Sequence, residues 1–225
     1  MPTQTAPRSQ RYAPPEVRRQ QLIEATLDAL AQKGVSGTTM AEVTRRAGLS
    51  MGIVSLHFQS KNNLLTATLR SLAEEIRDAW AHSHKDSTLS PAKRLSSVVA
   101  ASFDASTSSP TKMRAWFAFF GEARYRQIYR DMVTDFDEER IDAIETLCAR
   151  IIHEGGYKDI CPKTLAATVE CLCDGLWLSM ILYPDWMTPA DARCRVMDVL
   201  ARHFPMHFQL SGVQTGAGAQ AEGAT

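Results

Sequence analysis

The chain has 225 residues, 44% of them hydrophobic and 22% charged, and its formal net charge is zero. This composition is that of a soluble globular protein with enough apolar residues for a large core. We find neither the apolar run of about eighteen residues that a membrane helix needs nor the apolar segment of a signal peptide, so we expect a cytoplasmic protein without a membrane partner.

The charge is unevenly distributed along the chain. Residues 1–63 contain eight Lys or Arg and four Asp or Glu, a net charge of +4, and the remaining residues carry −4. A basic part attracts phosphate groups, whereas an acidic part repels them. This asymmetry predicts nucleic-acid binding by the N-terminal part alone.

Residues 1–14 are rich in Pro, Ser and Gln, and we expect a disordered basic arm there. Its Arg8 and Arg11 could reach a DNA groove, or the segment could simply be a disordered tail. The first helix is predicted to begin at Pro15 and to end at Gly34. Its apolar stripe comprises Val17, Leu22, Ile23, Leu27 and Leu30.

The stretch 39–61 has the pattern of two short helices joined by a tight turn. Thr39 can cap the first helix, with Glu42 three residues later completing a capping box. The helix ends at Ala47, and Gly48 supplies the left-handed residue that the turn requires. Ser50 is a second N-cap. This spacing predicts a helix-turn-helix, although an ordinary helical hairpin with a basic edge is the alternative.

The second of these helices is predicted to carry the DNA-reading face. Its buried side comprises Ile53, Val54 and Phe58, and small or apolar side chains point outward. Such a face suits the major groove, where Ser can hydrogen-bond to bases and Met can contact thymine methyl groups. The predicted DNA-binding residues are Thr39, Arg45, Arg46, Ser50, Met51, Gly52, Ser55, Leu56, His57 and Lys61.

Amphipathic helices continue through the rest of the chain. Ser60 caps a helix from about 61 to 81, roughly 30 Å long, which could act as a lever. Further helices are expected at about 91–105, 111–121, 124–133, 136–154, 163–182 and 189–204. The predicted fold is therefore all-α. We expect an arm at 1–14, a DNA-binding domain at 15–62, a helical ligand-binding and dimerisation domain at 63–208, and a disordered tail at 209–225.

The residues give no indication of catalysis, a metal site or a cofactor. The five cysteines lack metal-finger spacing, and we expect reduced thiols. The six histidines form no metalloprotease-like pair, and neither a phosphate-binding Gly loop nor a nucleophile motif is present. An enzyme is therefore not expected.

Two helices of the predicted C-terminal domain carry unusual side chains. Trp116 and Phe120 share a helix face, and Asp174 lies three residues before Trp177 in a stretch, Cys171–Tyr183, that is otherwise almost wholly apolar. Aromatic faces with one carboxylate form a site for a quaternary ammonium ion, at about 0.5 to 2 kcal/mol per face. Alternatively, the aromatic residues are core and Asp174 is held by an Arg or a hydroxyl.

The helices at 136–154 and 163–182 have apolar surface that a second copy could cover. We expect them to form a two-fold four-helix interface. Such a homodimer would place two recognition helices roughly 34 Å apart, over a palindromic operator.

The residues that close the helix-turn-helix, His57, Phe58 and Lys61, resemble those of the TetR family of bacterial repressors. Five further segments resemble its BetI-type subgroup, repressors of choline-to-glycine-betaine genes: Arg18–Leu30, Gly52–Ser55, Ser102–Asp104, Met113–Phe120 and Asp174–Leu178. The resemblance implies a homodimer and a choline-sized cation as the effector. It also implies that Phe103 lines the same cavity as Trp116, Phe120, Asp174 and Trp177.

The sequence thus predicts a repressor that binds double-stranded DNA and is released by a small-molecule effector. The hypothesised coupling is a shift between conformations worth about 1 to 3 kcal/mol. One alternative is the same fold with an uncharged effector, as in efflux or detoxification. Another is an architectural protein that binds DNA without regard to sequence or ligand.

Overall fold

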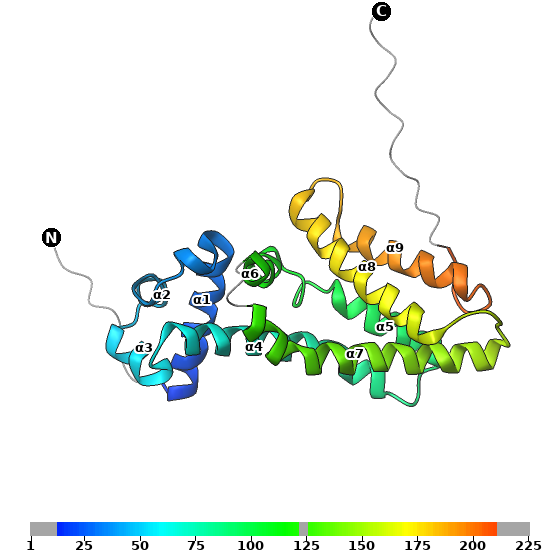
Figure 1. Ribbon diagram of the computed structural model, residues 1–225, viewed down its shortest axis with the longest axis horizontal. Coiled ribbons are helices and arrows are strands. Elements are labelled where there is room, and N and C mark those ends of the chain that lie inside the picture. Colours follow the sequence, from blue (N-terminus) through cyan, green and yellow to red (C-terminus); the bar gives the residue numbers. More distant parts are fainter. Residues whose placement is uncertain (1–12, 122–125, 211–225) are drawn as a thin grey trace, which may run out of the picture. The chain divides into compact units, whose positions relative to one another are not determined.

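The computed structural model describes residues 13–121 and 126–210, and within these ranges it consists of helices without strands (Figure 1). The all-α prediction is confirmed. The predicted arm and tail lie almost wholly outside the described residues. The helices are α1 (Pro15–Gly37), α2 (Met40–Ala47), α3 (Met51–Phe58), α4 (Lys61–Lys85), α5 (Pro91–Ser102), α6 (Pro110–Gly121), α7 (Arg126–Gly155), α8 (Pro162–Leu182) and α9 (Pro189–His203).

The helix boundaries differ most from the sequence prediction in α7, while α4 also runs to Lys85 instead of about 81 and α5 ends at Ser102 instead of about 105. The two helices expected at 124–133 and 136–154 are the single helix α7. Neither Gly nor Pro lies between them, and the hydroxyl of Thr134 donates a hydrogen bond to the Arg130 carbonyl within the helix. A polar side chain that is satisfied in this way does not end a helix.

The chain divides into two compact units. The first comprises residues up to Asp78 together with 105–138, and the second comprises 79–104 and the residues from Glu139 onward. Helices α4 and α7 each contribute residues to both units. The functional boundary expected between residues 62 and 63 stays a prediction.

In the first unit, α1, α2, α3 and the start of α4 enclose a small hydrophobic core (Figure 1). Its buried members are Leu22, Ile23, Ala25, Ala29, Val43, Val54, Phe58 and Leu64. The predicted stripe of α1 is largely confirmed, but Val17 is 45% exposed, because it lies in the first turn, N-terminal to this core. Helix α6 also packs against α1.

The end of α1 is fixed by side chains from neighbouring segments. Gly34 leaves the helical conformation with φ of 66°, as the sequence predicts. The hydroxyl of Thr38 donates to the Gly34 carbonyl at 2.7 Å, and the Lys61 ammonium donates to the Val35 carbonyl at 2.7 Å. These bonds satisfy carbonyl groups that the helix itself leaves unpaired.

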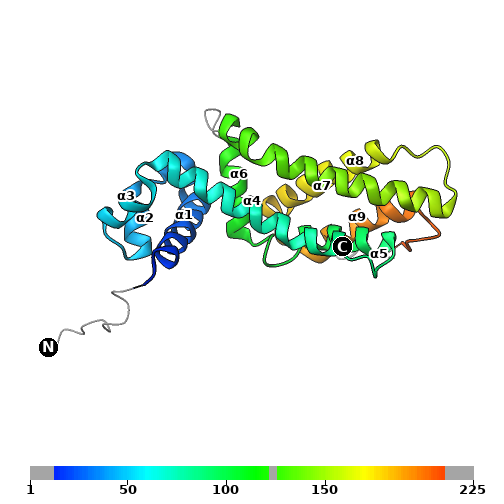
Figure 2. The ribbon, with the colours of Figure 1, turned by 90° about the horizontal axis from the view of Figure 1, so that it is seen from below.

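The second unit packs α5, α8, α9 and the C-terminal part of α7 around its own core (Figure 2). The α7 stripe that was expected to face a second copy lies inside this core, since Ile144, Leu147 and Ile151 are all at most 2% exposed. This stripe therefore packs inside the chain and not against a second copy, and whether α7 takes part in the dimer interface stays a prediction. The α8 half has an exposed side that includes Leu178 and Leu182.

Among the described residues, α8 is the one helix long and apolar enough to cross a membrane. Core helices satisfy the same test, so length and composition alone are weak evidence for a span. The inward side of α8, from Leu165 to Met180, is buried in the second unit and packs against α9. We therefore assign α8 to the core.

The left-handed turn at Gly48 permits a sharp test of the local fold. Gly48 has φ of 64°, where an added Cβ is strained even in open space. We expect Gly48→Ala to lower the free energy of unfolding by about 1 kcal/mol. Gly52, inside α3, should show the opposite sign, with Gly52→Ala raising it by about 0.5 kcal/mol. Urea denaturation measures both, and equal effects would contradict the turn geometry.

Candidate functional site

Helix α3 presents one face to the core and the other to solvent. Val54 and Phe58 are 0% and 4% exposed and fix the helix on the core. On the opposite face Met51 is 46% exposed and Leu56 is 79% exposed, with Gly52 and Ser55 beside them. The outward face predicted from the sequence is therefore present. A large apolar side chain as open as Leu56 is suited to contact with a partner.

The two N-caps of the helix-turn-helix differ in their bonds. The Thr39 hydroxyl accepts a hydrogen bond from the Glu42 backbone N–H at 3.1 Å, as predicted. In a capping box the Glu42 side chain would accept a hydrogen bond from the Thr39 backbone N–H. Here the Glu42 carboxylate pairs with basic residues instead. Ser50 has the extended backbone of an N-cap, but its hydroxyl accepts no capping bond.

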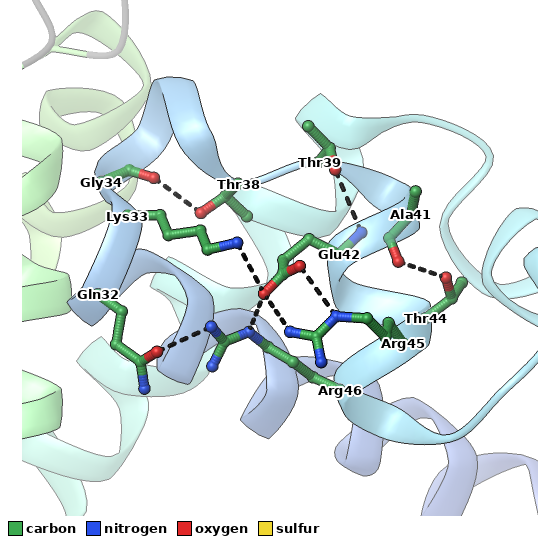
Figure 3. Close-up of polar contacts among 10 residues, drawn as sticks. All are labelled: Gln32, Lys33, Gly34, Thr38, Thr39, Ala41, Glu42, Thr44, Arg45 and Arg46. Atoms are coloured by element: carbon green, nitrogen blue, oxygen red, sulfur yellow. Dashed lines mark hydrogen bonds and ion pairs between the residues drawn. The ribbon is translucent and has the colours of Figure 1, made fainter.

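Glu42 lies at the centre of a cluster of three cations (Figure 3). One carboxylate oxygen lies 3.1 Å from Lys33 Nζ, 2.7 Å from Arg45 Nη2 and 2.7 Å from Arg46 Nε. The other accepts from Arg45 Nε at 3.2 Å. Hydrogen bonds from Arg45, Arg46 and Lys33, in that order, lower the pKa of Glu42 from 4.5 to about 2.

The two neighbouring arginines have different environments in this cluster. The Arg46 side chain is 15% exposed and also donates to Gln32 Oε1 at 2.8 Å, so it ties α2 to α1 (Figure 3). The Arg45 side chain is 67% exposed and contacts only its own helix in this cluster. Lys33 comes from α1. The sequence did not indicate Lys33 or Gln32, because pairing between helices carries no short-range signal.

The remaining predicted DNA-binding residues lie near the end of α3. His57 is half-buried, with its ring 6.2 Å from that of Phe58. Lys61 is half-buried and engaged with the Val35 carbonyl. Lys61 therefore contributes to the local fold as well as to the positive charge beside α3.

In the second unit, two predicted effector-site residues meet at the end of α5. Phe103 is buried and forms the C-cap of α5. The indole N–H of Trp177 donates to the carbonyl of the preceding residue, Ser102, at 2.7 Å. The structure thus brings the α8 indole to the backbone beside Phe103.

A buried ion pair that was not predicted from the sequence lies at the same place. Arg140 of α7 donates to Glu170 of α8, and its other terminal nitrogen donates to the Ser102 hydroxyl at 3.1 Å. Arg140 and Glu170 are each only 9% exposed. A buried charge needs a partner, and each supplies one to the other.

Asp174, the carboxylate predicted for the aromatic box, lies on the exposed side of α8, whereas Trp177 lies on the buried side. Although this side chain reaches solvent, the packed protein around it raises the pKa of the carboxyl by desolvation, and Arg140 opposes that rise. The carboxylate that shares the buried side of α8 with Trp177 is Glu170.

The aromatic residues of α6 belong to the first unit. Trp116 is buried there, and the side chain of Phe120 lies outside the described residues. Whether these two residues complete a box with Phe103 and Trp177 therefore stays a prediction.

Comparison with known proteins assigns the family. Residues 22–68 match the family "Bacterial regulatory proteins, tetR family", and residues 91–205 match "BetI-type transcriptional repressor, C-terminal". The chain belongs to the TetR family. The helix-turn-helix and the outward face of α3 lie in the first match, and the Arg140–Glu170 pair lies in the second.

Individual relatives agree with this assignment. The chain is 38% identical over 173 residues to the HTH-type transcriptional regulator BetI of Paraburkholderia phymatum, covering 76% of this chain and 84% of the relative. It is 32% identical over 202 residues to BetI of Escherichia coli K12, covering 84% and 95%. These matches are to regulators of transcription, so the protein is a BetI-type transcriptional repressor rather than an enzyme.

Solved structures show the same fold. A putative transcriptional regulator from Pseudomonas aeruginosa PAO1 superposes with a TM-score of 0.72 at 26% identity, over 90% of this chain and 98% of that one. A putative transcriptional regulator from Saccharomonospora viridis, solved in complex with choline, gives a TM-score of 0.66 at 18% identity, over 84% and 97%.

The Glu42 cluster should make stability depend on pH in an acid window. The pKa of Glu42 is lowered on folding, so its contribution is complete above about pH 4.5 and is lost as the pH falls towards 2. We expect Glu42→Gln to be less stable than the parent at pH 7, with the difference shrinking between pH 4.5 and 2. Chemical denaturation across this range measures it. Glu138→Gln, at an exposed position, is the control, and a pH-independent difference for Glu42→Gln would refute the assignment.

Proposed function

We propose that this repressor acts as a homodimer on a palindromic operator and that a small quaternary amine releases it from DNA. The exposed face of α3, on a capped three-helix core, carries the DNA-binding part of the proposal. The BetI-type C-terminal match supports the effector part. A cytoplasmic location accords with a regulator that binds DNA.

For DNA contact, we propose that the outward residues of α3 enter the major groove. Ser55 offers a hydroxyl to base edges, while Met51 and Leu56 offer apolar contact to thymine methyl groups. Arg45 is the predicted phosphate-binding residue whose side chain is most open. If Arg45 moves to a phosphate, Glu42 keeps Lys33 and Arg46, so its carboxylate is not left unpaired.

For assembly, we propose that a second copy covers the exposed side of α8. Leu178 is 41% exposed and Leu182 is 57% exposed on this helix. Directly after it, the rings of Tyr183 and Trp186 stack 6.3 Å apart, and Trp186 is 81% exposed. This much open apolar surface is typical of an interface. Two copies would then read half-sites roughly 34 Å apart.

For the effector, the BetI names of the curated relatives support a quaternary amine, and a structural neighbour of the same fold was solved with choline. Phe103 and Trp177 would supply aromatic surface for its methyl groups. Helix α4 contributes to both compact units, so a ligand that favours one position of α4 would shift the spacing of the two recognition helices. That shift would release the second half-site.

One observation favours the alternative of an uncharged effector. The buried carboxylate of Glu170 is already paired with Arg140, so this pair has no net charge, and Asp174 is exposed. A neutral compound could bind against Trp177 without adding a positive charge that lacks a partner.

The two arginines of the Glu42 cluster should separate DNA binding from folding. We expect Arg45→Ala to weaken binding to all DNA sequences and to reduce the salt slope of log K by about 0.9, the change for one phosphate contact, with a smaller loss of stability than Arg46→Ala because its ion pair with Glu42 is exposed. Arg46→Ala should instead lower the free energy of unfolding by about 1 to 2 kcal/mol, since it breaks the link to Gln32. Fluorescence anisotropy at several salt concentrations and urea denaturation measure the two effects. The same phenotype for both variants would contradict this division.

The effector is tested by a gel shift on the upstream intergenic DNA of the gene. The DNA complex is titrated at fixed salt with choline, betaine aldehyde and glycine betaine, and with 3,3-dimethylbutan-1-ol, which is choline with carbon in place of nitrogen. Release by an amine but not by the carbon analogue supports a cationic effector. Equal release by the carbon analogue would favour an uncharged effector, and sequence-specific binding without release by any of the three amines would rule these amines out.

A further inference from the structure

The Glu170 carboxylate is only half satisfied. One of its oxygens pairs with Arg140, while Oε2 is buried and has no hydrogen-bond partner among the described residues. A buried oxygen without a donor is unfavourable, because in the unfolded chain it would bind water. Such exceptions in a core mark places where a ligand or a water supplies the missing bond.

The groups around Glu170 form a polar centre, and the aromatic residue beside it is Trp177. Ser102 joins them, since its hydroxyl accepts from Arg140 and its carbonyl accepts from Trp177. Burial raises the pKa of the Cys173 thiol, one turn along α8 from Glu170, and the side chain of Ser102 opposes that rise. The three helix segments that carry these residues, from α5, α7 and α8, belong to the second unit.

One hydrogen-bond acceptor at this centre lacks a partner. The indole N–H of Trp177 is already used by the Ser102 carbonyl, and Arg140 donates both to Ser102 and to Glu170. The buried side-chain atom of this centre that has no hydrogen-bond partner is an acceptor, Glu170 Oε2. A molecule that completes the centre must therefore bring a hydrogen-bond donor.

We infer that Glu170, and not Asp174, is the carboxylate that recognises the effector, and that the effector carries a hydroxyl group which donates to Glu170 Oε2. This inference rests on the proposed function, because it concerns the quaternary amine that we assign to this domain. A quaternary ammonium group has no N–H and cannot supply the bond. The hydroxyl end of the ligand binds Glu170, and its methylated end lies against Trp177.

This assignment selects among amines of similar size. Choline has the hydroxyl donor. Its methyl ether, (2-methoxyethyl)trimethylammonium, keeps the charge and nearly the same shape but has no donor. Glycine betaine has no donor either, and its carboxylate would meet the Glu170 carboxylate.

The test is calorimetric titration of the full-length protein, without DNA, with choline and with its methyl ether. We expect choline to bind at least about tenfold more tightly, as the loss of one hydrogen bond to a charged group implies. In Glu170→Gln, an amide N–H replaces the open oxygen and can donate to either ligand, so the preference should fall to within about threefold. Asp174→Asn changes an exposed carboxylate one turn away and should keep the full preference.

Each outcome decides a separate claim. Equal binding of the two ligands by the parent protein overturns the donor requirement, whatever the variants do, and leaves the repressor assignment standing. A preference lost in Asp174→Asn but kept in Glu170→Gln returns the role to Asp174. If neither amine binds while operator binding is intact, both this inference and the amine effector fail. Circular dichroism and operator binding without ligand establish that Glu170→Gln is folded.

Discussion

The orientation of α3 depends on the burial of two side chains. A helix of eight residues is unstable by itself in water, so neither its existence nor its direction is set by its own backbone bonds. Val54 and Phe58 anchor it in the core formed with α1 and α2. Because these anchors fix the rotation of the helix, Met51 and Leu56 must face outward. The DNA-reading face is thus a consequence of core packing.

Electrostatics adds a second constraint to the same unit. The basic residues beside the helix-turn-helix look interchangeable in the sequence, but the fold assigns them different roles. Arg46 and Lys61 form hydrogen bonds that hold α1 in place, whereas the side chain of Arg45 is mostly in solvent. The net charge of a region therefore overstates the number of cations that are free to meet phosphate. What matters is how many of these cations can leave their internal partner without leaving that partner unpaired.

The parts that sequence could predict are those set by neighbouring residues. Thr39 caps α2, Gly48 turns the chain, and the faces of α3 follow from helical spacing. The errors concern pairing across long separations. Arg140 and Glu170 are thirty residues apart, and their meeting depends on how α7 packs against α8. Composition made Asp174 conspicuous in an apolar stretch, yet Glu170, one turn earlier and rotated by only about 40° around the helix, is the carboxylate that is buried.

The two carboxylate clusters illustrate how satisfaction of hydrogen bonds separates structural from functional roles. Glu42 has bonds to both of its oxygens from three cations, so it stabilises the fold and has no capacity left for a ligand. Glu170 has one cation and one open oxygen in a buried setting. A core that leaves such an oxygen open is less stable than one that fills it, and a molecule able to fill it gains that difference as binding free energy. An effector that binds in this way would stabilise the conformation in which Arg140, Ser102 and Trp177 surround it, which is the differential affinity that any release from DNA requires.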